Sequence, residues 1–172
     1  MREVFDFSFT LNRHQFSIVN TLKDHKCKIN SFRAPSAPTK PAMQSWRKRL
    51  FNTILALNPR HPDALHLLGM LKLQRGNPAA ALDPLSKASE IQPRNWVLLA
   101  DLAQALFALQ QFTQANAAFR AAAKLNRDNP ELQIGAANCL ALQGNFAGAE
   151  YALRKIARRF PATASVWFNL AN

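Results

Sequence analysis

The feature that most constrains the fold of this chain is an internal repeat of 34 residues. When the sequence is compared with itself at this offset, small residues share one position, as Gly69, Ala103, Ala137 and Ala171. An alanine recurs twelve residues later, at 81, 115 and 149. Four residues further on, a large apolar residue recurs at 85, 119 and 153. Agreement of several positions at one offset indicates an array of similar structural units.

Each unit is predicted to form two helices. Apolar residues between 65 and 73 follow the spacing of one helical face. Gly76 then interrupts the helix, and Asn77 can cap a second helix that has Pro78 at its first position. The second helix should end near Pro93, because proline disfavours the helical conformation in the residue before it. We therefore expect an all-α stack of antiparallel helix pairs, in which each unit buries what its neighbour leaves exposed.

The residues that define the first copy of the repeat are Leu68, Gly69, Gly76, Ala81, Leu85, Ala88 and Pro93. With the 34-residue period, this pattern resembles the tetratricopeptide repeat (TPR). The resemblance implies an α-solenoid of antiparallel helix pairs that winds as a right-handed superhelix. Small residues such as Gly69 and Ala81 are expected to let neighbouring helix axes approach closely.

The repeat pattern divides the chain into an N-terminal extension at 1–41 and an array at 42–172. Whole repeats are expected at 62–95, 96–129 and 130–163, with partial helices at 43–58 and 164–172. The extension does not fit the period, and its proline-rich end predicts a weakly ordered linker. Because the last repeat is incomplete, we hypothesise that the chain is the front part of a longer protein.

The charge of the chain is strongly positive and unevenly distributed. Lys and Arg total 22 against 10 Asp and Glu, and the formal net charge is +12. Most of the excess positive charge lies in residues 1–61, which include the basic cluster Arg47, Lys48 and Arg49. A second basic cluster comprises Arg154, Lys155, Arg158 and Arg159. Proteins that read nucleic acids usually combine such charge with aromatic or glycine-rich elements. Neither cluster shows that combination in the sequence, so we expect solvated helix faces rather than a nucleic-acid site.

The sequence lacks the motifs of the common enzyme and metal sites. There is no phosphate-binding loop, HExxH, paired CxxC or GxSxG. His61 and His66 are five residues apart, which does not place two metal ligands on one helical face, and Cys27 and Cys139 form no cluster. We therefore predict no catalytic residues, no metal and no cofactor. Without a legible signal peptide or an apolar run long enough to span a bilayer, a cytoplasmic protein is expected.

In a TPR array, the first helix of each repeat lines the inner groove, and helical phase indicates which side chains face it. The predicted groove residues are Asp63, His66, Met70, Leu73, Val97, Asp101, Gln104, Phe107, Glu131, Ile134, Asn138 and Leu142. This set mixes apolar side chains with carboxylates and amides and contains no Lys or Arg. Such a surface would suit an extended or helical polypeptide, including one with basic residues opposite the carboxylates.

The sequence thus predicts a module that scaffolds protein partners through its concave groove, binding a peptide or a protein domain. An alternative remains open, because the HPDALHLLG and FPATASVWFNLAN stretches resemble arrays that precede bacterial sulfotransferase or glycosyltransferase domains. Under that alternative, the chain would be the N-terminal TPR region of a longer enzyme.

Overall fold

The computed structural model describes residues 40–163, 165 and 167, and this part of the chain is built from α-helices without strands. The helices are α2 (Lys40–Leu57), α3 (Pro62–Gln74), α4 (Pro78–Ile91), α5 (Trp96–Ala108), α6 (Phe112–Leu125), α7 (Pro130–Leu142) and α8 (Phe146–Arg159). The predicted extension at 1–41 lies outside the described residues except for its last two, which begin α2. Most of the partial helix predicted at 164–172 also lies outside them.

The helices begin where the repeat places polar caps. Asn77 Oδ1 accepts the Ala80 N–H at 3.0 Å, and Pro78 is the first residue of α4, as predicted. Asn95, Asn129 and Asn145 cap α5, α7 and α8 in the same way. These caps satisfy backbone N–H groups that have no partner inside the helix. Asparagine in the sequence therefore marks the start of α4, α5, α7 and α8, whereas α6 follows Gln111, which makes no side-chain cap.

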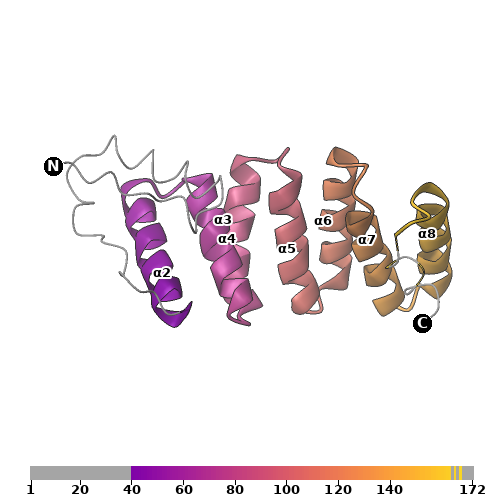
Figure 1. Ribbon diagram of the computed structural model, residues 1–172, viewed down its shortest axis with the longest axis horizontal. Coiled ribbons are helices and arrows are strands. Elements are labelled where there is room, and N and C mark those ends of the chain that lie inside the picture. Colours follow the sequence, from indigo (N-terminus) through magenta and orange to yellow (C-terminus); the bar gives the residue numbers. More distant parts are fainter. Residues whose placement is uncertain (1–39, 164, 166, 168–172) are drawn as a thin grey trace.

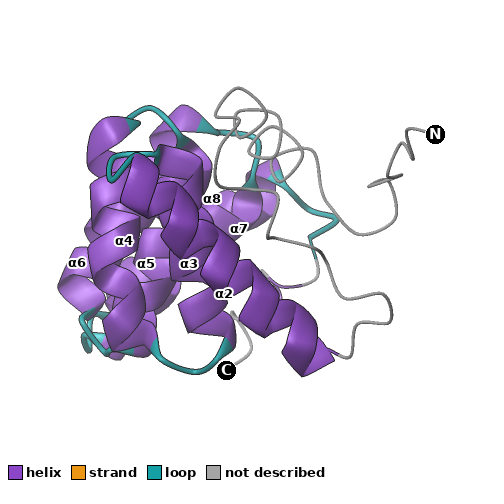
Figure 2. Ribbon diagram, turned by 90° about the vertical axis from the view of Figure 1, so that its left-hand side faces the viewer, coloured by secondary structure: helices purple, strands orange, loops and turns teal. Residues whose placement is uncertain are grey.

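The helices stack in single file along the molecule (Figure 1). Each helix packs against the next one along the chain, and α3 also touches α5. Figure 2, which looks along the stack, shows α4 and α6 on its left and α3, α5 and α7 to their right. This arrangement confirms the predicted all-α solenoid of helix pairs, in which first helices follow first helices and second helices follow second helices.

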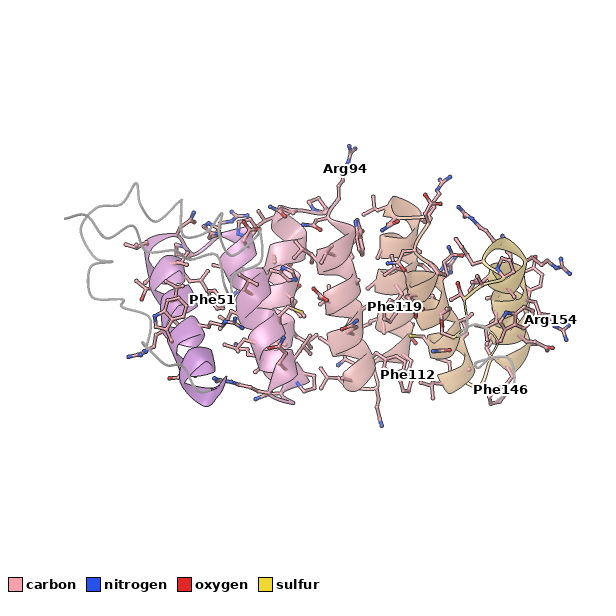
Figure 3. The ribbon with its side chains drawn as sticks, viewed as in Figure 1. Phe51, Arg94, Phe112, Phe119, Phe146 and Arg154 are labelled. Carbon is pink, nitrogen blue, oxygen red and sulfur yellow. The ribbon has the colours of Figure 1, made fainter. Side chains whose placement is uncertain are left out.

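Small residues form the contacts between helices, as predicted. Ala81 and Ala115 are completely buried, and Ala149 is also in the core. The closest neighbour of Gly69 is Leu85, because a Cβ added at Gly69 would lie 2.5 Å from Leu85 Cγ. Between the second and third helix pairs, a Cβ added at Gly135 of α7 would lie 3.0 Å from the ring of Phe119 of α6. Figure 3 labels Phe119 within the stack. The glycines thus accept the large side chains that fill the core.

The turn inside each helix pair repeats with one exception in its sequence. Gly76 and Gly144 have positive φ angles of 70° and 81°. Gln110, at the equivalent position of the middle pair, has a φ of 60°. In all three turns the N–H of the following residue bonds back to a carbonyl five residues earlier, at distances of 2.9 to 3.0 Å. The middle turn therefore forms the same backbone structure without glycine.

Candidate partner-binding surface

The first helices of the three pairs, α3, α5 and α7, form a surface that we call the A-helix surface. Its middle row consists of residues 34 positions apart, namely Met70, Gln104 and Asn138. Gln104 is exposed, and the other two are half-buried. A second row, nearer the starts of the helices, contains Asp63 and Val97, which are half-buried, and Glu131, which is exposed. The repeat thus brings predicted site residues from three helices into parallel rows.

One side-chain hydrogen bond joins two of these helices. His66 Nε2 of α3 lies 2.5 Å from Asp101 Oδ2 of α5. Both side chains are largely removed from solvent, so the Asp101 carboxylate has a partner where a lone buried charge would be costly. The two residues are 35 positions apart, which is one repeat plus one residue. This contact fixes the relative position of two neighbouring first helices.

Two predicted groove residues are less accessible than expected. Ile134 is only 3% exposed, because it packs against Leu153 and Ile156 of α8 in the core. The expectation that Ile134 faces the groove is therefore wrong. Asp101 is 8% exposed, so the carboxylate expected to attract a basic ligand is instead bonded to His66.

Some predicted groove residues near the helix ends pack against the core, and others are exposed to solvent. Leu73 and Phe107 are half-buried against the core, and the Phe107 ring meets the Phe112 ring edge to face at 5.6 Å. Leu142, at the end of α7, is 54% exposed. Glu131 accepts a hydrogen bond from Ser165 Oγ at 2.8 Å. Of these, Leu142 offers the largest uncovered apolar side chain to a partner.

Comparisons with known proteins agree with this architecture. Two sequence profiles of the family described as tetratricopeptide repeat match residues 48–95 and 106–171, which together make up about two thirds of the chain. The chain belongs to the tetratricopeptide repeat family. No curated protein matches its sequence.

Solved structures of other TPR proteins share the fold. The crystal structure of MamA aligns with a TM-score of 0.70 at 18% identity, covering 76% of this chain and 76% of that one. The crystal structure of YrrB, described as a TPR protein with an unusual peptide-binding site, aligns with a TM-score of 0.70 at 18% identity, covering 77% and 68%. A MamA fragment from Desulfovibrio magneticus RS-1 gives 0.64 at 16% identity, covering 71% and 74%.

The two kinds of helix in this TPR array carry different charge. The first helices α3, α5 and α7 contain three acidic residues and one basic residue. That basic residue, Lys72, points toward α4, where its Nζ donates to the Ala80 carbonyl at 2.9 Å. The second helices α4, α6 and α8 contain three acidic and seven basic residues. The excess positive charge of the helix pairs therefore lies on the second helices, away from the A-helix surface.

The described part of this TPR chain contains no candidate metal-binding cluster. No three His, Cys, Asp or Glu side chains come together there in a way that could hold a metal ion. Burial raises the pKa of the Cys139 thiol to about 11, which keeps it protonated and weakly nucleophilic at neutral pH. None of the helices described is long and apolar enough to cross a membrane.

Two features of the TPR array were not predicted from the sequence. The His66–Asp101 pair could have been found by searching for hydrogen-bonding side chains one repeat and one residue apart on first helices. The other feature is Tyr151, which is 74% exposed and shares a face of α8 with basic residues. The signal for it is helical spacing, since Tyr151 precedes Arg154 by three residues and Lys155 by four.

Proposed function

We propose that this protein is a non-enzymatic scaffold that binds a polypeptide partner across its A-helix surface. The observation that carries the proposal is the row formed by Met70, Gln104 and Asn138, flanked by the exposed Leu142. These side chains are apolar or uncharged polar groups, and the surface around them has almost no positive charge. They can contact apolar side chains and hydrogen-bond the main chain of a bound segment.

The charge of the surface supports a ligand that carries Lys or Arg together with apolar residues. Asp63 and Glu131 keep part of their surface accessible near the starts of α3 and α7. Asp101 is occupied by His66, so it does not contribute to this attraction. Electrostatic complementarity of this kind favours specificity and fast association more than affinity. The peptide-binding site named for YrrB supports a polypeptide ligand for a protein of this fold.

The proposal is tested by selecting peptides from a phage-displayed library against the full chain and measuring the affinity of the synthesised peptides. We expect selected sequences to combine apolar residues with Lys or Arg. The variant Gln104→Arg/Asn138→Arg places two cations in the middle row and should weaken peptide binding at least about tenfold through charge repulsion and steric hindrance.

A matched control adds the same charge to a second helix. The variant Gln114→Arg/Ala117→Arg alters two exposed positions of α6 and should change the affinity less than twofold. Circular dichroism should show the same helicity for both variants. Equal loss of binding in the two variants, or none in either, would contradict binding at the A-helix surface.

A further inference from the structure

The outward face of α8 combines an exposed aromatic ring with several cations. Tyr151 is 74% exposed, and Arg154, Lys155 and Arg158 follow it at three, four and seven residues. At these spacings the four side chains share one face of the helix. Figure 3 shows Arg154 projecting away from α8 at the end of the stack. The ring is therefore surrounded by positive groups on an open surface.

The preceding second helix extends this positive surface. Arg120 and Lys124 of α6 are exposed and lie one repeat before Arg154 and Arg158. Equivalent positions of neighbouring repeats point in similar directions, so the two helices present parallel pairs of cations. The basic second-helix surface, as we define it, comprises Arg120, Lys124, Tyr151, Arg154, Lys155 and Arg158.

Acidic residues neutralise little of this surface. Within the described part of the chain, Glu150 pairs with Arg154 at 2.6 Å, and Asp128 pairs with the neighbouring Arg159 at 2.9 Å. No ion pair in that part involves Arg120, Lys124, Lys155 or Arg158. Four cations thus remain available to an anionic partner.

We propose that the basic second-helix surface binds single-stranded nucleic acid, with Tyr151 stacking on a base and the surrounding cations contacting phosphates. Sequence-tolerant binding of single strands depends on this combination of an aromatic platform and a positive track. An acidic polypeptide would use the cations but would leave the exposed ring without a function. A lipid surface would require an apolar face, yet the other large exposed apolar side chain of α8, Phe146, lies roughly 140° around the helix from Tyr151.

This site is separate from the A-helix surface, so either proposal can fail without the other. It also revises the interpretation of the basic cluster at Arg154–Arg159 as a solvated face. That interpretation relied on the absence of an aromatic residue within the cluster, whereas helical spacing places Tyr151 beside its cations.

The test uses the full chain and a fluorescently labelled, unstructured 20-nucleotide single-stranded DNA, with binding followed by anisotropy at several salt concentrations. The variant Lys155→Glu/Arg158→Glu should weaken binding at least about tenfold at low salt and reduce the salt dependence, because fewer counterions are released. Tyr151→Ala should weaken binding at least about fivefold, the lower end of the effect of losing one stacked base, whereas Tyr151→Phe should bind as the unmodified chain does.

The matched control is Arg75→Glu/Arg94→Glu, which changes the charge equally at two exposed turn positions, one between α3 and α4 and one between α4 and α5. Figure 3 shows Arg94 at a distance from α8. It should alter the affinity less than threefold. The proposal is overturned if this control weakens binding as much as the α8 variant, or if Tyr151→Ala has no effect. It is also overturned if polyglutamate or vesicles containing phosphatidylserine bind the chain more tightly than the oligonucleotide and lose that binding in the α8 variant.

Discussion

At the scale of single residues, the core is formed by large side chains packed against very small residues. Leu85 packs against Gly69 and Phe119 packs against Gly135, where a Cβ atom would come too close to the large side chain. Alanines at 81 and 115 are completely buried in the same contacts. Because protein interiors are close-packed, these positions define how near two helices can come. Cys139 is another small, completely buried residue, and the reactivity of its thiol can be measured.

Cys139 should be almost inert in the folded protein. It is completely buried, and burial raises the pKa of its thiol from 9.0 to about 11. In a Cys27→Ala background, alkylation by iodoacetamide at pH 8 should be at least about 100-fold slower in the native chain than in urea, since the thiolate is the nucleophile. Similar rates in both conditions would show that Cys139 is accessible.

The raised pKa of the Cys139 thiol predicts that the free energy of unfolding falls at alkaline pH. Below about pH 9 the thiol is protonated in both the folded and the unfolded chain, so its full contribution to the free energy of unfolding is present. As pH rises from about 9 to 11, the unfolded chain loses this proton first, and the stability from this group declines. A Cys139→Ala variant should lack this component of the decline in urea denaturation curves.

At the scale of structural elements, the middle helix pair has the least favourable turn. Gln110 adopts a positive φ of 60°, where the equivalent residues are Gly76 and Gly144. The next residue, Gln111, makes no side-chain cap for α6, whereas Asn77 and Asn145 cap the equivalent helices. A side chain in the left-handed conformation and a missing cap each cost stability.

The double variant Gln110→Gly/Gln111→Asn should therefore stabilise the protein, by about 1–2 kcal/mol in the free energy of unfolding. Urea denaturation followed by circular dichroism measures this change. As a control, Gly144→Gln should destabilise by about 1 kcal/mol through backbone strain alone, because no atom lies within 4 Å of an added Cβ there. A destabilised double variant would mean that the middle turn is held by contacts other than its backbone geometry.

At the scale of the whole molecule, repetition places two different surfaces on one solenoid. The first helices bring a mildly acidic and apolar surface together, and the second helices carry most of the cations in the helix pairs. Because each helix type recurs every 34 residues, side chains of similar chemistry at equivalent positions form a row across the molecule. Under the two proposals made above, these surfaces bind partners of opposite charge without competing.

The sequence predicted the helix pairs well because their signals are local. Asn77 caps the helix that begins at Pro78 with its own side chain, and the 34-residue period follows from comparison of the chain with itself. The orientation of single side chains depends on the other helices that pack against them, and it was predicted less well. Ile134 turns into the core because Leu153 and Ile156 of α8 cover it, and Asp101 is bonded to His66 from another helix. Neither contact is visible within one helix's own sequence.

Site-specific photo-crosslinking tests directly whether a polypeptide binds along the A-helix surface. A photoreactive benzoylphenylalanine is placed at position 104 on α5 or at position 117 on α6, both of which are exposed. Each protein is then irradiated with a peptide selected on the unmodified chain. Binding along the A-helix surface should give a covalent adduct at position 104 and none at position 117. Adducts at position 117 alone, or equally at both positions, would contradict it.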